Sequence, residues 1–336
     1  MQINIFRWRT LAAGIAFMVL ICGAPARIYG ASANLWIALD SGRDSALESY
    51  ASGQLKKSGM PTPTHLSTFS SARGLAFDKS HNLWAVIDEI NEVVRFTPAQ
   101  LKNLRNDPNP TPDVVITSAS TFRNPVGCNF DGQGNLWVVD YSNASLDELS
   151  KAQLAAGSGD VTPAIVITSP DLDSPDFVTF DKAGNAWLND EDISIIAKFS
   201  ARQLTSSGSK SPALTLSDDG SGSSLSIPGE IAFDESGNLW VPNFGSDTVA
   251  EYAKTQLTKS GKPVPKVKFT SAIFHSEEPW GAAFNSKGDL FVMNWGNGVI
   301  AEFKPTQLRA SGAPVPKVTV TGTENLNVQI SFGPGS

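Results

Sequence analysis

The sequence predicts an all-β protein, a six-bladed β-propeller of four-stranded blades, because two short markers recur six times in phase. The first marker is Asn-Leu-Trp or a close variant, and its copies lie 48 to 53 residues apart, starting at residues 34, 82, 135, 185, 238 and 289. The second marker is Gln-Leu, which starts at residues 54, 100, 153, 203, 256 and 307. Six units of about 50 residues are typical of a propeller.

One copy of the repeat shows four strand patterns in succession. Residues 230–234 are short and largely apolar, which suits a buried inner strand, and residues 239–243 form a second apolar run. Residues 247–252 and 266–271 alternate between apolar and polar side chains, as half-buried strands do. We therefore expect every unit to be one small sheet whose inner strand lines a central channel.

An Asp and a Gly mark the turn between the first two strands of a unit. In one copy these residues are Asp131 and Gly134, and in another they are Asp234 and Gly237. The carboxylate can bond the backbone of the turn, and glycine adopts positive φ without a Cβ clash. His81 takes the glycine place in a third copy, and histidine tolerates positive φ better than most residues. We interpret His81 as a turn residue.

The Gln-Leu marker follows the third strand and is typical of a single helical turn. Residues 97–100 read Thr-Pro-Ala-Gln, a capping box with proline at the first helical position. Residues 150–153 and 200–203 repeat the box with Ser and Gln. A short proline-containing segment then leads into the outer strand, so we predict no domain boundary within the repeats.

The two ends of the chain predict how the ring closes. Phe77 precedes the marker at Asn82 by five residues, and the internal copies share this spacing. The first copy begins at Asn34 with no inner strand before it, whereas residues 329–332 form an inner-strand pattern with no partner after it. We expect this C-terminal strand to complete the first blade non-covalently, which makes residues 34–336 one domain and covers two sheet edges.

The first 26 residues have the pattern of a secretory signal peptide. Arg7 and Arg9 precede an apolar run over residues 11–21, and Ala-Pro-Ala at residues 24–26 fits a cleavage site, with a later site at residue 33. We expect a secreted or periplasmic protein that has no membrane span after cleavage. Of the two cysteines only Cys128 would remain, so no intrachain disulfide is expected.

Composition and charge narrow the class of partner. The chain has 336 residues, is 41% hydrophobic and carries a formal net charge of −7. An acidic protein repels phosphate backbones, which excludes nucleic acid as a partner. We expect a monomer whose partner is a protein, a small molecule or a glycan.

Residues 227–234, Ile-Pro-Gly-Glu-Ile-Ala-Phe-Asp, followed by Ser-Gly-Asn-Leu-Trp-Val at residues 236–241, resemble the NHL-repeat propellers. The likeness covers nearly all of the mature chain and extends to the wider superfamily of calcium-dependent phosphotriesterases, gluconolactonases and streptogramin lyases. The residues that match are those that build blades. The resemblance therefore implies a six-bladed propeller and leaves the activity open.

The resemblance also implies what a catalytic member would need. Gluconolactonase-like members hold a divalent metal on the channel axis with acidic and Asn residues that precede inner strands. Asp176 matches such a place, although Phe177 stands where the family has Gly, and Glu230 lies where the family has Asn. These two acids are the metal candidates, but a site needs about four or more donors. We assign no metal and require no cofactor; Ca²⁺ or another divalent cation stays an option. Streptogramin lyases use histidines with a Glu, and here His275 alone lies in a loop that could reach the mouth.

Polar and aromatic residues recur at the positions that should surround one mouth of the channel. The loops before the inner strands and the ends of the second strands are expected on the same face. The candidate binding residues from the loops are Arg73, Asp176, Glu230 and Trp280, and those from the strand ends are Asp40, Asp88, Asp140, Asp190, Asn243 and Asn294. Such residues suit a cation or a polyol. The alternative is that Asp and Asn cap the turns at the strand ends.

Three functions fit the sequence. It favours a secreted, non-catalytic module that binds a ligand or protein on the loop face around the channel. The alternative is a metal-dependent lactonase or related hydrolase with its site at the channel mouth, resting on Asp176 and Glu230. A third is a structural interaction module of the cell envelope. The sequence contains no nucleophile elbow, phosphate-binding glycine loop or Cys/His metal spacing, so catalytic residues stay unassigned.

Overall fold

The computed structural model describes residues 33–39, 47–274, 278–321 and 327–333. The predicted signal peptide lies outside these residues, as do Asp40 and His275. Helices of the described segments are all too short or too polar to cross a membrane.

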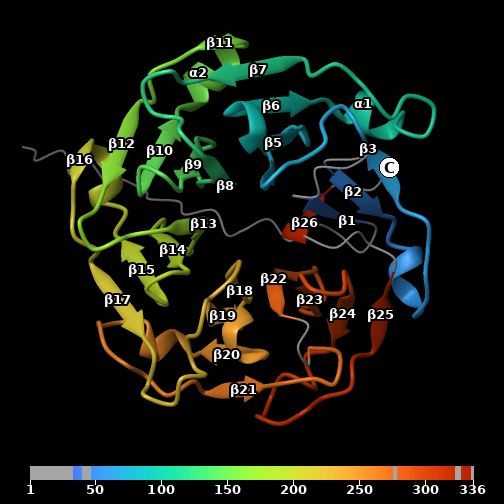
Figure 1. Ribbon diagram of the computed structural model, residues 1–336, viewed down its shortest axis with the longest axis vertical. Coiled ribbons are helices and arrows are strands. Elements are labelled where there is room, and N and C mark those ends of the chain that lie inside the picture. The colour runs from blue at the N-terminus through green and yellow to red at the C-terminus, as the bar shows by residue number, and fades with distance from the viewer. Residues whose placement is uncertain (1–32, 40–46, 275–277, 322–326, 334–336) are drawn as a thin grey trace, which may run out of the picture.

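Six small sheets form a closed ring around a central channel (Figure 1). Blade 1 contains β26 (Asn327–Gly333), β1 (Asn34–Leu39), β2 (Leu47–Tyr50) and β3 (Thr64–Leu66). Blade 2 contains β4 (Gly74–Phe77), β5 (Leu83–Ile87), β6 (Glu92–Phe96) and β7 (Val114–Thr117). Blade 3 contains β8 (Pro125–Phe130), β9 (Leu136–Asp140), β10 (Ser145–Leu149) and β12 (Ile165–Thr168). The predicted six-bladed propeller is confirmed.

The remaining blades repeat this order from the channel outwards. Blade 4 contains β13 (Pro175–Phe180), β14 (Ala186–Asp190), β15 (Ile195–Phe199) and β17 (Leu214–Ser217). Blade 5 contains β18 (Ala232–Phe233), β19 (Leu239–Asn243), β20 (Thr248–Tyr252) and β21 (Val267–Phe269). Blade 6 contains β22 (Pro279–Phe284), β23 (Leu290–Asn294), β24 (Ile300–Phe303) and β25 (Val318–Val320). The inner strand of blade 5 is shorter than predicted, because Glu230 N donates its hydrogen bond to Trp280 O of blade 6 at 2.8 Å.

Short elements connect the blades. The helices are α1 (Pro98–Lys102) and α2 (Lys151–Ala156). The 3-10 turns are η1 (Gln54–Lys56), η2 (Asp88–Ile90), η3 (Gln203–Thr205), η4 (Phe244–Ser246) and η5 (Lys254–Gln256). Two-residue strands, β11 (Gly159–Asp160) and β16 (Gly208–Ser209), extend the outer edges of blades 2 and 3.

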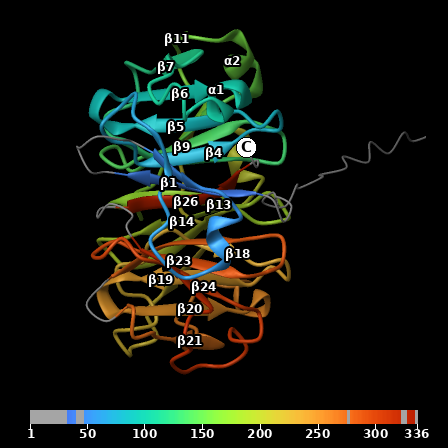
Figure 2. The same cartoon turned by 90° about the vertical axis from the view of Figure 1, so that its right-hand side faces the viewer.

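The ring closes through the C-terminal strand, as predicted. β26 lies antiparallel beside β1, and the two strands are drawn next to each other in Figure 2. Phe332 pairs with Leu35 in this sheet, just as Phe77 pairs with Leu83 in blade 2, where a turn connects the two strands. The non-covalent junction therefore has the same register as a covalently connected blade.

The first marker and the inner-strand phenylalanine meet between blades. The aromatic residue of each second strand contacts the phenylalanine of the next blade, and the ring centroids lie 5.1 to 6.4 Å apart. The six pairs are Trp36–Phe77, Trp84–Phe130, Trp137–Phe180, Trp187–Phe233, Trp240–Phe284 and Phe291–Phe332. Such pairs add stabilisation beyond the apolar area they bury. No blade could bury its own aromatic face alone, which explains why the repeats stack in a ring.

In blades 2 to 5 an aspartate holds the turn after the inner strand, and in blade 6 Asn285 takes this place. Asp131 accepts hydrogen bonds through Oδ1 from the backbone N of Gln133 and Asn135, and through Oδ2 from Trp137 Nε1 at 3.0 Å. Gly134 has φ 92°, and His81 has φ 67° in the corresponding place of blade 2. The turn role predicted for His81 is confirmed.

The glutamine of the second marker is a structural bridge. Gln100 Oε1 accepts a hydrogen bond from Thr97 N at 2.8 Å, which completes the predicted capping box of α1. Its Nε2 donates to Thr111 O at 2.6 Å, in the segment that leads to the outer strand. The corresponding glutamines of the other five blades make the same pair of bonds. The marker recurs because each blade needs this connection.

A strap, the segment that follows each Gln-Leu marker, reaches the outer strand of the preceding blade. In blade 3 the strap contains Ser158 and Gly159; Ser158 Oγ accepts a hydrogen bond from Val115 N at 3.0 Å, and Gly159 pairs with Ile116 of β7. Similar parallel pairings are made by the glycines of four further straps, Gly59, Gly208, Gly261 and Gly312. The strap of blade 2 differs, because it contacts blade 1 just beyond β3, where Ser67 N donates to Pro108 O at 2.7 Å.

Candidate functional site

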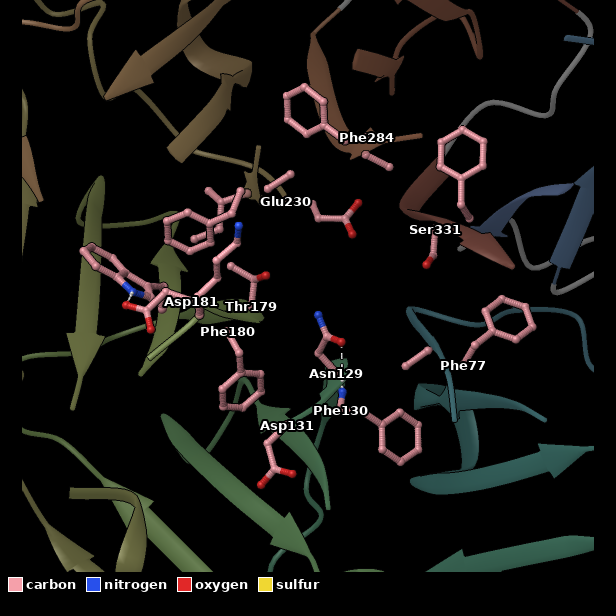
Figure 3. A pocket seen from close by; sticks show the side chains of 18 of the residues that line it. Phe77, Asn129, Phe130, Asp131, Thr179, Phe180, Asp181, Glu230, Phe284 and Ser331 are labelled. Carbon is pink, nitrogen blue, oxygen red and sulfur yellow. Dashed lines mark hydrogen bonds between the residues drawn. The ribbon is translucent and has the colours of Figure 1, made fainter. Parts of the chain in front are cut away.

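A cavity of about 930 Å³ occupies one end of the central channel. It lies at the end where the inner strands finish and the Asp-containing turns begin, which we call the turn end. Figure 3 shows the labelled side chains of this cavity, contributed by several blades around an open centre. We call the cavity and its lining the cup.

The wall of the cup is aromatic. Each inner strand contributes one phenylalanine, and the six are Phe77, Phe130, Phe180, Phe233, Phe284 and Phe332. Each ring is held by its aromatic partner in the neighbouring blade, so the wall is preformed. A rigid apolar wall favours binding of apolar ligand surface, because little conformational entropy is lost on binding.

The floor of the cup mixes small and polar side chains. The residue before each phenylalanine lines the cavity, and these residues are Ala76, Asn129, Thr179, Ala232, Ala283 and Ser331. Figure 3 shows Asn129, Thr179 and Ser331 extending towards the open centre. Asn129 Nδ2 already donates to Val178 O at 3.3 Å. The Thr179 and Ser331 hydroxyls make no hydrogen bond within the described part of the chain, so they are available to a ligand.

Glu230 and Gln329 join the blades beneath this floor. The Glu230 carboxyl lines the cup, and its Oε2 accepts a hydrogen bond from Ile330 N of the closing strand at 2.9 Å. Gln329 Oε1 accepts from Leu75 N at 2.6 Å. Burial raises the pKa of Glu230 well above its usual range, which favours the neutral acid. The floor is therefore polar but holds little negative charge.

The opposite end of the channel, which we call the loop end, is filled by side chains. Phe177 and Trp280 come from blades 4 and 6, and their ring centroids lie 6.3 Å apart. They are 1% and 6% exposed and belong to the same buried cluster. Beside them Arg73 Nη2 lies 3.4 Å from Oδ1 of the fully buried Asp176. The mouth expected from the sequence is at this end of the channel.

The acidic and amide residues predicted there bind the backbone of their own blades. Asp140 Oδ2 accepts a hydrogen bond from Arg123 N at 2.6 Å, and Asp190 Oδ2 accepts one from Asp173 N at 2.7 Å. Asn243, Asn294 and Asp88 make corresponding contacts with the loops of their blades, to Ser226 N, Ile273 O and Ser71 Oγ. Each of these side chains connects a strand end to the loop before the inner strand, which is the turn-capping alternative. The structure does not bring the set together at one centre.

The metal candidates do not form a donor set. Asp176 is paired with Arg73, and Glu230 accepts a backbone N–H, so neither environment suits a divalent cation. Within the described residues no group of three or more His, Cys, Asp or Glu side chains is placed to hold a metal ion. Of the predicted binding residues, Glu230 alone lines the cup.

Glu191 is a loop-end residue that the sequence did not point out. Burial, helped by the nearby Asp176 carboxylate, raises the pKa of Glu191 to about 7. Its neighbour Asp190 was singled out by its position at the strand end, and Glu191 follows directly. The cup itself was also missed. The signal was present in the phenylalanine that recurs five residues before each marker, together with the residue preceding it.

Comparison with known proteins establishes the fold. No protein family and no curated protein matches the chain in sequence. Solved structures that resemble it include a nidogen/laminin complex (TM-score 0.63, 15% identity, 90% of this chain and 99% of that chain). A streptogramin B lyase gives a TM-score of 0.51 at 15% identity over 70% of this chain and 66% of its own. Virginiamycin B lyase from Staphylococcus aureus gives 0.53 at 12% identity over 82% and 83%. At these identities the likeness shows a shared propeller architecture, whose members differ in function.

Proposed function

We propose that the protein is a binding module that holds a small, largely apolar ligand in the cup. The observation that carries this proposal is the preformed cavity of about 930 Å³ with a phenylalanine from every blade in its wall. Ligand sites are commonly cavities of about 300–1,000 Å³ with apolar walls and a few polar groups. The proposal moves the site from the loop face, where the sequence suggested it, to the turn end.

The lining also suggests how the ligand is oriented. Apolar rings of the ligand would contact the phenylalanine wall, where aromatic pairs prefer edge-to-face or offset arrangements. A hydroxyl or carbonyl group at the inner end of the ligand would bond Thr179 and Ser331. Because few conformational changes are needed, binding should be fast and should leave the ring unchanged.

The test is to fill the cup and measure binding of a neutral aromatic probe, N-phenyl-1-naphthylamine, by its fluorescence. Ala232 is a partly exposed lining residue of β18, and Ala232→Trp places an indole in the cavity. We expect affinity for the probe to fall at least about tenfold, because the space for its rings is lost. The matched control is Ala310→Trp at an exposed position outside the cup, which should bind like the wild type.

A second variant that fills the cup keeps the test valid if Ala232→Trp does not fold. Ser331→Phe occupies the cup from blade 1, and circular dichroism with thermal unfolding shows whether each variant is folded. If folded Ala232→Trp and Ser331→Phe proteins both retain wild-type affinity, or if the wild type does not bind the probe at all, the proposed function is wrong.

A further inference from the structure

The rim of the cup is rich in lysine, although the whole chain is acidic. The net charge of the protein is −7. Five lysines from blades 2 to 5 nevertheless line the cavity, and these are Lys79, Lys151, Lys182, Lys198 and Lys254. Contacts between blades account for part of this set, because Lys79 and Lys182 donate to backbone carbonyls in the turn of the next blade.

The aspartates of the same rim are already occupied by the turns. Asp131 accepts five hydrogen bonds, from three backbone N–H groups, the Asn135 side chain and Trp137 Nε1. Asp181 accepts four from the corresponding groups of blade 4. A carboxylate has about four lone-pair sites, so these oxygens have little capacity left for a ligand. Among the described acids of the rim, Glu235 has a carboxylate without such bonds.

The ammonium groups of the rim lysines differ from these aspartates in what they bind. Lys151, Lys198 and Lys254 make no ion pair with any residue that the structure describes. Lys198 Nζ lies 5.0 Å from the centroid of the Trp187 ring. Lys182 Nζ donates to Glu235 O at 2.6 Å, and Lys79 Nζ donates to Gly132 O at 2.8 Å; both acceptors are backbone carbonyls rather than carboxylates. An approaching ligand therefore meets the open donors of Lys151, Lys198 and Lys254, and carboxylates that keep their negative charge but have few lone pairs left to accept further bonds.

We propose that the natural ligand is an amphipathic anion, with an aromatic or polycyclic body in the cup and one anionic group at the lysine rim. This inference rests on the proposed function and names its class of ligand. The floor and the rim of the cup determine how the ligand is oriented. None of the described floor residues is a lysine or arginine, so an anion buried there would lose its hydration without a compensating cation, whereas the rim offers ammonium groups. The apolar body enters first and the charge stays outside.

Two probes that differ by one charged group test this inference. 1-Anilinonaphthalene-8-sulfonate is an aromatic monoanion, and N-phenyl-1-naphthylamine is the same ring system without the sulfonate. We expect the wild type to bind the anion at least about threefold more tightly, and this preference to shrink between about 0.02 and about 0.2 M NaCl. The binding of the neutral probe should not depend on salt.

The lysines are tested directly with a matched pair of double variants. Lys151→Gln with Lys254→Gln removes two rim charges and should weaken sulfonate binding about threefold or more, leaving the neutral probe unaffected. The control, Lys259→Gln with Lys262→Gln, removes the same charge from exposed positions of blade 5 outside the cup. It should bind both probes like the wild type.

The outcomes separate the two proposals. If the wild type binds neither probe, the cup is not a ligand site and the proposed function fails with this inference. If it binds the neutral probe as tightly as the sulfonate, and the rim variant matches the control, the ligand is a neutral apolar molecule. The inference is then overturned while the cup remains a binding site. Sulfonate binding that survives Ala232→Trp would place the probe elsewhere and would also overturn it.

Discussion

The two ends of the channel are built from the same repeat, yet described side chains meet across the channel at one end and surround a cavity at the other. At the loop end Phe177 and Trp280 fill the axis, and Asp176 is buried against Arg73. At the turn end the axis is lined by small residues such as Ala232, and the larger side chains form a wall around it. The sixfold repeat of similar blades thus places side chains at corresponding positions around the channel. The sizes of those side chains determine which end can bind a ligand.

The largest expected effect comes from removing the strand that closes the ring. Deletion of residues 325–336 removes β26, its Phe332 and the Gln329 contact beneath the floor. Because blade 1 then lacks its inner strand, we expect loss of cooperative unfolding and aggregation through the open sheet edges. Thermal unfolding and size-exclusion chromatography measure this. A truncated protein that stays monomeric and equally stable would contradict the closure.

The strands, turns and junction could be predicted because each depends on a local pattern that recurs. The cavity at the turn end could not be predicted, because it depends on how side chains from different blades meet. Phe177 shows the difference. The resemblance to gluconolactonase-like propellers already marked it as an aromatic residue in the place of a glycine, but its role in filling the axis needs Trp280 from blade 6 opposite it. No pattern within one repeat contains that contact.

A smaller but still large effect is expected from removing one aromatic contact between blades. Trp240→Ala deletes the partner of Phe284 and should lower the free energy of unfolding by about 3–5 kcal/mol, as truncation of large buried aromatic residues does. It should also weaken binding in the cup, because Phe284 loses its support. Urea unfolding and titration with the neutral probe measure the two effects.

A substitution at the loop end, Arg73→Met, should lower stability without changing ligand binding. Arg73→Met leaves the buried Asp176 carboxylate with fewer partners, at a cost of about 1–3 kcal/mol. Because Arg73 does not line the cup, affinity for the probe should stay unchanged. A loss under 1 kcal/mol for Trp240→Ala would mean that the contact between blades contributes little, and weaker probe binding by Arg73→Met would mean that the two ends are coupled.

The smallest expected effect is a difference in pH dependence between the two ends. The pKa of Glu230 is raised on folding, so the folded state holds its proton at pH values where the unfolded chain has released it. Stability should therefore fall as pH rises above about 4.5, the usual pKa of a glutamate. Glu230→Gln stays neutral, so its free energy of unfolding should decline less than that of the wild type as the pH rises above about 4.5.

Glu191→Gln gives the matching comparison at the loop end. The pKa of Glu191 is raised to about 7, so its contribution to the decline in stability should end near that pH. Urea unfolding at a series of pH values distinguishes the two variants. Identical curves for Glu230→Gln and the wild type would show that this carboxyl is ionised in the folded protein.

The straps have a consequence for how the molecule comes apart. Five outer strands each pair through one or two residues with the strap of the blade that follows, whereas the strap of blade 2 contacts blade 1 beyond the end of β3, at Ser67 and Thr68. In the same blade the inner strand β26 and its neighbour β1 lie far apart in the sequence, so no turn joins them. Under mechanical force or limited proteolysis, blade 1 should therefore unfold before the other blades, and the ring should open there.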